Sequence, residues 1–457
     1  MSAAAGVSRP GRAATAAHLA TLAGGGAVLL GLGRNQWFFY DEWNFLAGRG
    51  LGARPLDLFT PHNEHWSTIP ILVYRGLFAV FGLHSYLPYL GVLVALHVAL
   101  AHLLWRVALA SGARPWVATA LAPLGLVYGA GSGDLVWAFQ IGFTGSLVLG
   151  VAAVLVLLGG ATAARLVAAN ALLVAGLMCS GNGVTMVAIA GAVALLAWGL
   201  IPAVWTVVPP AAVYVAWYIR IGHVGQQTPL PRGSDILIVP RFAWTGMTAS
   251  IDESVGVSWL GAATIAVLAA LVGAALLGRE RRRVAVPAAF LAGACVFFVS
   301  SGLTRWPFGA DYARSSRYLL VGFVLALPAL WWCASWLVAR RREAIVLVAA
   351  AAILVAVHGT RTLRDSARGS ASVEYDNRAR ILAAAGLVDG GTVILGDRPD
   401  PSVSPQLDWT EVVDLVHAGA LPSGPAPSNQ ARMDVEAQLL VALDPAPRLA
   451  PGSGVPL

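Results

Sequence analysis

Long apolar runs constrain the fold of this chain more than any other sequence feature. A helix needs about 20 mostly apolar residues to cross the hydrocarbon core of a bilayer. Only 12% of the 457 residues are charged, against about 25% in soluble domains. Backbone groups in lipid must be paired within the spanning element, which favours helices. The sequence therefore predicts an all-α, multi-pass protein of the cytoplasmic membrane. We expect about eleven transmembrane helices, near 14–33, 86–110, 115–130, 140–160, 164–180, 183–201, 203–221, 256–278, 285–303, 317–338 and 343–358.

The distribution of arginine predicts how these helices are oriented. All 30 basic residues are Arg, and cytoplasmic loops of membrane proteins are enriched in basic residues. With the N-terminus inside, the inner loops hold twelve Arg and two acids, a charge of +10. The outer loops before residue 359 then carry ten Arg and nine acids, a charge of +1, and residues 359–457 carry eight Arg and twelve acids, a charge of −4. We therefore expect the N-terminus inside and the C-terminal region outside.

This distribution also argues against a nucleic-acid partner. The pI of about 9.7 could indicate a basic binding surface, but the excess charge lies in short inner loops that orient the spans. Cysteine gives no further signal, because Cys179, Cys295 and Cys333 form neither a disulfide framework nor a CxxC pair.

The first outer loop, 34–85, is densest in groups that can do chemistry. Its first cluster is FFYDEW, residues 38–43. Aromatic belts at the membrane boundary explain the rings but not the adjacent acids Asp41 and Glu42. A partly desolvated carboxylate can have a raised pKa and act as a general base. We therefore take Asp41 and Glu42 as the candidate catalytic residues.

The second cluster of this loop is PHNEHW, residues 61–66. His62, Glu64 and His65 could ligate a divalent metal, contact a substrate or cap the following helix. The spacing is not HExxH, so a zinc-hydrolase motif is absent. The apolar stretch 69–82 that follows is short for a span, and we expect an interfacial helix there.

Later outer segments add further candidates for substrate binding. GSGDLVWAFQ (131–140) places Asp134 and Gln140 at a turn between two spans. TRWPFGADYARSSRY (304–318) brings together several arginines on the outside, against the positive-inside rule. Arg binds phosphate bidentately, although these side chains could instead pair with acids or lipid headgroups. The candidates in this segment are Arg305, Arg314, Arg317 and Tyr318.

These features together resemble the GT-C superfamily of polytopic membrane glycosyltransferases. YDEW after the first span matches the position of the acidic motif in the first outer loop of that superfamily. SSRYLL (315–320) is similar to the start of a late span in the protein mannosyltransferase and lipid A aminoarabinose transferase branches. The resemblance covers roughly 1–358, a transmembrane domain whose outer loop 34–85 would be catalytic. The large carbohydrate-binding domain of arabinosyltransferases and a WWD-type motif are both missing from the sequence.

The resemblance implies an enzyme that uses a polyprenyl-phosphate-linked sugar and transfers it, with inversion, to an envelope glycan, lipid or protein. Asp41 would be the base, with Glu42 as its alternate, while Glu64 and Asp134 could orient the acceptor or hold a metal. Arg317, then Arg314 and Arg305, would bind the lipid phosphate. We expect Asp41, Glu64 and Arg317 to converge on one outer cavity. Some members of the superfamily need a divalent cation and others do not, and the sequence leaves this open.

Two other functions of polytopic envelope proteins fit this sequence less well than glycosyl transfer does. A polysaccharide polymerase or ligase should concentrate Arg and His in a large late loop, whereas here the first loop is densest. A transporter or flippase usually has carboxylates near the membrane centre, and none of the predicted spans does. The remaining segment, 359–457, is expected to be a small extracytoplasmic region with a short strand at 391–396, partly disordered after 420.

Overall fold

The computed structural model describes residues 10–226, 228–278, 280–389, 398–422 and 428–443. Within these ranges the regular secondary structure is helical, and an isolated antiparallel bridge joins His62 to His65. The protein is thus an all-α, polytopic integral membrane protein. The expected strand at 391–396 lies outside the described residues.

The described helices match the predicted spans segment by segment. Eight are long and apolar enough to cross a membrane: Arg12–Gly33 (α1), Leu87–Ala110 (α4), Ala138–Leu158 (η3 and α7), Leu200–Arg220 (α10), Leu260–Leu277 (α12), Arg281–Phe308 (containing α13, Ala285–Arg305), Ser316–Arg340 (α14) and Ala344–Val388 (within α15, Ala344–Asp389). The other three predicted spans contain shorter apolar helices: Pro115–Val127 (α5, Pro115–Leu121, and η1, Ala122–Val127), Ala163–Leu177 (α8) and Asn182–Trp198 (α9). The total of eleven spans and their orientation stay predictions.

Among the helices of residues 89–368, α11 (Ile238–Asp252) was not expected from the sequence. It is buried on one side by contacts with α12, α13 and α14. Arg241 and several hydroxyl residues interrupt its apolar character, so no apolar run of membrane length marks it.

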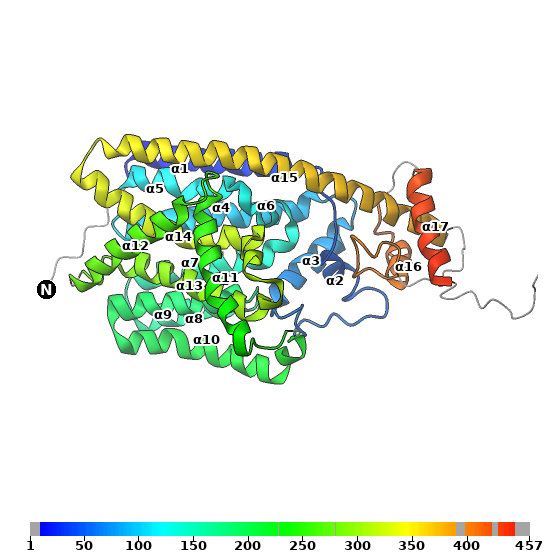
Figure 1. The fold of residues 1–457 in the computed structure, drawn as a ribbon. Helices are drawn as coiled ribbons and strands as arrows, with labels where there is room; N and C mark the ends of the chain where they lie inside the picture. The colour runs from blue at the N-terminus through cyan, green and yellow to red at the C-terminus, as the bar shows by residue number, and fades with distance from the viewer. Residues whose placement is uncertain (1–9, 227, 279, 390–397, 423–427, 444–457) are drawn as a thin grey trace, which may run out of the picture. The chain divides into compact units, whose positions relative to one another are not determined.

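Contacts divide the chain into two units. The first unit comprises residues 1–34, 58–72 and 89–368. In it α7, α8, α9 and α10 pack as neighbours, and α13 contacts α9, α11 and α14 (Figure 1). At Gly359, α15 packs closely on the end of η1, because a Cβ on Gly359 would lie 1.9 Å from the Val127 carbonyl oxygen.

The second unit comprises residues 35–57, 73–88 and 369–457. It joins parts of the first outer loop to the C-terminal region, and its helices include α2 (Glu42–Leu46), α16 (Trp409–His417) and α17 (Asn429–Leu443). The Trp43 indole donates to Ser404 Oγ at 2.8 Å, and the Leu83 amide donates to the Ala420 carbonyl at 2.8 Å. α3 (Thr68–Phe81), which fills the predicted interfacial stretch, begins in the first unit and ends in the second.

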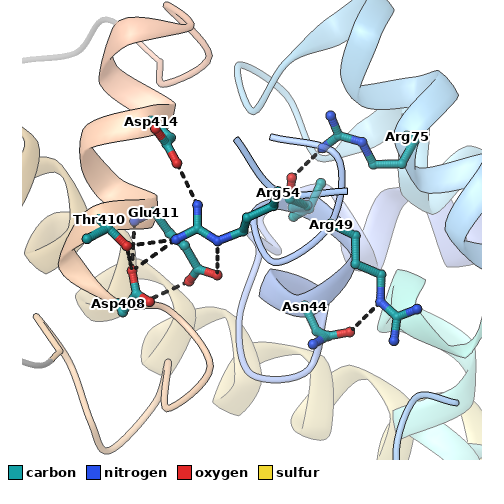
Figure 2. A network of polar contacts seen from close by, with 9 residues as sticks. Asn44, Arg49, Arg54, Arg75, Asp408, Thr410, Glu411 and Asp414 are labelled. Carbon is teal, nitrogen blue, oxygen red and sulfur yellow. Dashed lines mark hydrogen bonds and ion pairs between the residues drawn. The ribbon is translucent and has the colours of Figure 1, made fainter. Parts of the chain in front are cut away.

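An arginine network ties the loop to α16 inside the second unit (Figure 2). Arg54 lies 2.5 Å from Asp414, 2.7 Å from the Thr410 hydroxyl, 3.6 Å from Asp408 and 3.7 Å from Glu411. Asp408 and Glu411 also form a capping box that satisfies two amides at the start of α16. The region expected to be partly disordered after 420 contains α17, while 423–427 and 444–457 lie outside the described residues.

Candidate active site

The residues proposed from sequence fall into both units. Asp41 and Glu42 belong to the second unit, and the others belong to the first: His62, Glu64, His65, Asp134, Gln140, Arg305, Arg314, Arg317 and Tyr318. The convergence of Asp41 with Glu64 and Arg317 on one cavity stays a prediction.

A tight turn, and not a helix start, presents the PHNEHW side chains. His62 and His65 exchange two backbone hydrogen bonds of 3.0 Å, which leaves Asn63 and Glu64 at the tip. Asn63 has a φ of 52°, a left-handed conformation that asparagine tolerates better than most residues. The following helix begins only at Thr68, so the two imidazoles do not cap it.

This turn places Glu64 and His65 beside two arginines. Glu64 Oε2 accepts a hydrogen bond from Arg305 at the end of α13, at 2.7 Å. His65 interacts electrostatically with Arg305 and Arg317, and burial together with these cations lowers its pKa to about 4. His65 is therefore neutral near pH 7 and can exchange hydrogen bonds with a polar ligand. Gly181 lies against it, because a Cβ there would approach the ring nitrogen Nδ1 to 2.9 Å.

Arg317 is the arginine of this group whose charge is least compensated. Its guanidinium donates to the Tyr312 hydroxyl at 2.6 Å and lies 5.3 Å from the centre of the Tyr318 ring. Both contacts orient the guanidinium without neutralising it. Arg314, by contrast, is paired with Glu253 at 3.0 Å in a half-exposed ion pair.

Asp134 is a buried acid whose side chain has no hydrogen-bond partner in the described part of the chain. It lies on the short helix α6 (Ser132–Val136), is only 1% exposed, and neither carboxylate oxygen has a hydrogen-bond partner among the described residues. Burial raises the pKa of Asp134 well above its ordinary value, while nearby Arg317 opposes that rise. His97 holds this segment by donating from Nε2 to the Asp134 carbonyl oxygen at 2.8 Å.

Glu64, His65, Asp134, Arg305 and Arg317 thus form one group in the first unit, here called the Arg–carboxylate cluster. Several of its polar atoms are buried without a partner among the described residues: Glu64 Oε1, His65 Nδ1 and both Asp134 oxygens. Gln140 Oε1 is buried and unpaired in the same sense. Buried polar atoms without partners are costly, and they commonly mark places where a ligand completes the hydrogen bonding.

Asp41 and Glu42 have different surroundings in the second unit. Glu42 is fully buried and accepts hydrogen bonds from the Tyr74 hydroxyl at 2.6 Å, the Tyr86 hydroxyl at 3.1 Å and the Phe39 amide at 3.0 Å. Asp41 is 8% exposed and accepts a hydrogen bond from Gln406 Nε2 at 3.0 Å. The bonds to Glu42 satisfy both of its oxygens, which suits a structural role.

Metal ligation by the histidines gains no geometric support. Among the described residues, no group of three or more His, Cys, Asp or Glu side chains lies close enough to hold a metal ion. We therefore derive no step through a divalent cation.

Sequence reasoning did not single out two residues that contact the candidates. Tyr312 lies in the quoted segment 304–318 and could have been found as an aromatic hydroxyl five residues before Arg317. Gln406 belongs to the C-terminal region, and nothing in the sequence indicates its contact with Asp41.

No family model matches the chain, and no curated protein matches it either. The fold itself is shared with a solved structure. The chain is similar to the crystal structure of ArnT from Cupriavidus metallidurans bound to undecaprenyl phosphate, with a TM-score of 0.50 and 13% sequence identity. That likeness covers 92% of this chain and 87% of the ArnT chain.

Proposed function

We propose that this protein is a GT-C-type glycosyltransferase of the cytoplasmic membrane that moves a sugar from a polyprenyl-phosphate donor to an extracytoplasmic envelope acceptor. The observation that carries the proposal is the Arg–carboxylate cluster, in which cations stand beside buried polar atoms that lack partners. The ArnT-like fold supports the same class of donor, since the ArnT structure contains undecaprenyl phosphate.

Arg317 is our first candidate for binding the donor phosphate. A guanidinium donates in a fork that matches two phosphate oxygens, and Arg317 is oriented by Tyr312 and Tyr318 without an ion pair to a neighbouring acid among the described contacts. Arg305 is second, because its charge is already matched by Glu64. Arg314 becomes the weakest candidate, because it is half exposed and paired with Glu253.

Asp41 remains our candidate for the base. A base needs an oxygen that can accept a proton, and Glu42 has both oxygens committed to tyrosine hydroxyls and a backbone amide. Asp41 lies next to Tyr40, whose φ of 52° is unusual for a bulky residue. Strained backbone of this kind concentrates at functional sites.

In the proposed reaction, one side chain accepts the proton of the acceptor and another stabilises the leaving group. The Asp41 carboxylate takes the proton of an acceptor hydroxyl, and the hydroxyl oxygen attacks the anomeric carbon of the donor sugar. The bond from that carbon to the phosphate oxygen breaks, which inverts the configuration and releases polyprenyl phosphate. Arg317 stabilises the negative charge that grows on the leaving phosphate.

Transfer of a radiolabelled sugar from polyprenyl-phosphate donors, in membranes containing the full chain, tests this proposal. We expect Asp41→Asn to abolish transfer, while Asp376→Asn, which changes an exposed acid of the same unit, should transfer at the unchanged rate. Unchanged transfer by Asp41→Asn would remove Asp41 from the reaction. Absence of transfer by the parent protein with every donor tested would argue against the function itself. Repeating the assay with a chelator decides whether a divalent cation is needed.

A further inference from the structure

Two cavities flank the turn between α12 and α13, at the predicted inner face of the first unit. The larger has a volume of about 830 Å³ and lies between this turn and the α9–α10 junction, where Trp198 and Gly199 line it. The smaller, of about 370 Å³, lies between the same turn, the α4–α5 junction and the end of α14. Glu280 and Arg283 line both. These volumes suit small-molecule or headgroup ligands.

The walls of these cavities carry an excess of positive charge. Arg281, Arg282 and Arg283 line the larger cavity, and all three are exposed. Glu280 is the acid that lines it, and its contact with Arg283 is a loose one of 3.6 Å between two exposed side chains. Arg114 adds a further cation to the smaller cavity. Four arginines therefore face one glutamate, a surplus that an anion of two or three charges would neutralise.

Tryptophan rings lie beside two arginines of the predicted inner face. The Arg282 guanidinium lies 5.3 Å from the centre of the Trp198 ring, and the Arg340 guanidinium lies 3.8 Å from the centre of the Trp336 ring. Trp336 also lines the smaller cavity. Tryptophan is typical of the membrane–water boundary, so the cations stand where a lipid phosphate would lie.

Unpaired hydrogen-bond donors add a second, independent observation. Trp331 is 1% exposed and lines the smaller cavity, yet its indole Nε1 has no hydrogen-bond partner among the described residues. The Ser111 hydroxyl, which belongs to the same lining, is also buried without a partner in that part of the chain. Such donors cost free energy unless an acceptor meets them.

We propose that these cavities bind the phosphate groups of an anionic ligand, supplied by a phospholipid of the inner leaflet. Basic pockets between transmembrane helices on the cytoplasmic side suit anionic headgroups, and arginine suits phosphate oxygens. The site is separate from the Arg–carboxylate cluster, because α13, which is 21 residues long, has the turn at one end and Arg305 at the other. At about 1.5 Å per residue this is roughly 30 Å, so the site would bind its ligand without touching the proposed donor.

Native mass spectrometry of the full chain in detergent, titrated with cardiolipin, phosphatidylglycerol or phosphatidylcholine, tests this site. We expect the two anionic lipids to bind and phosphatidylcholine to bind far more weakly. The double variant Arg281→Gln/Arg282→Gln should weaken anionic-lipid binding about tenfold or more. Its matched control, Arg341→Gln/Arg342→Gln, removes two exposed arginines of the same predicted face that line neither cavity.

Equilibrium dialysis with labelled inorganic phosphate distinguishes a lipid from a soluble source. Phosphate binding that is lost in Arg281→Gln/Arg282→Gln, without anionic-lipid binding, would keep the phosphate site and overturn its lipid source. Equal lipid binding by this variant, its control and the parent protein would overturn the site altogether. Trp331→Phe, which keeps the ring but removes the donor, should weaken binding several-fold. Thermal unfolding of each variant confirms that it is folded.

Discussion

Two polar clusters of this molecule contain the same kinds of side chain but arrange them differently. Around Arg54, each guanidinium nitrogen lies near an acceptor on Asp408, Thr410, Glu411 or Asp414 (Figure 2). In the Arg–carboxylate cluster, polar atoms are buried without partners within the described ranges. Polar networks whose members are all hydrogen-bonded stabilise a fold. Buried polar groups without partners lower stability, and a bound ligand can supply the missing hydrogen bonds.

The difference teaches how to separate structural from functional charge in a membrane protein. Both clusters unite residues far apart in the sequence, and both include arginine on the predicted outer side. The two clusters differ in whether their buried polar atoms have hydrogen-bond partners among the described residues. Variants of the Arg54 network should therefore affect stability, and variants of the Arg–carboxylate cluster should affect activity.

Among variants of these two clusters, the largest effect is expected for Arg317→Gln. If Arg317 stabilises the leaving phosphate, its loss should reduce the rate of sugar transfer by about a hundredfold or more. Arg314→Gln is the matched control, since Arg314 lies three residues away in a half-exposed pair with Glu253, and it should retain nearly full activity. Transfer assays on both variants check this. Equal activities would contradict the role of Arg317 in stabilising the leaving phosphate.

The next effect is a loss of stability in Arg54→Gln. This change leaves three acids close together without their shared cation, and we expect unfolding of the second unit to become easier by about 1–2 kcal/mol. Arg432→Gln, which breaks an exposed pair with Glu436, should change stability by less than about 0.5 kcal/mol. Hydrogen exchange of α16 measures the difference. A lower transfer rate per folded molecule in Arg54→Gln would contradict a purely structural role.

Asp134→Asn should separate stability from activity. Because the side chain is buried without a hydrogen-bond partner among the residues that the structure describes, we expect stability to stay level or rise by up to about 1 kcal/mol, while transfer falls. The matched control is Asp252→Asn, because the buried Asp252 accepts a 2.7 Å bond from the Gly261 amide and should lose stability when changed. Thermal unfolding in detergent compares the two. A destabilised Asp134→Asn protein would show that Asp134 is a structural residue.

The smallest effect is a pH dependence from Glu411. Burial, with the charges of Asp408 and Asp414, raises the pKa of Glu411 to about 7, although the hydrogen bond from the Asp408 amide and the charge of Arg54 oppose the rise. Between its ordinary pKa of 4.5 and 7, the folded state binds more protons than the unfolded state, so stability should fall as the pH rises through this window. Glu411→Gln should remove this slope in unfolding curves. An unchanged slope would place its origin in another group.

The sequence determined the elements that depend on local composition. Each of the eleven predicted spans contains an apolar helix, because a run of apolar residues dictates both burial in lipid and a helical backbone. The sequence did not predict α11, because its polar residues interrupt the apolar run by which a span is recognised, although the helix packs against its neighbours. It also named Glu64, from the PHNEHW cluster, and Arg305 and Arg317, since arginine on the outer side needs a reason.

Only the tertiary structure decided which of these groups are partners. Nothing local predicts that Glu64 meets Arg305 across 241 residues, or that Asp134 is left without a partner in the described part of the chain. Nor does composition reveal that the C-terminal region packs with pieces of the first outer loop. Hydropathy is set by each segment alone, whereas charge pairing depends on how segments distant in sequence pack in space.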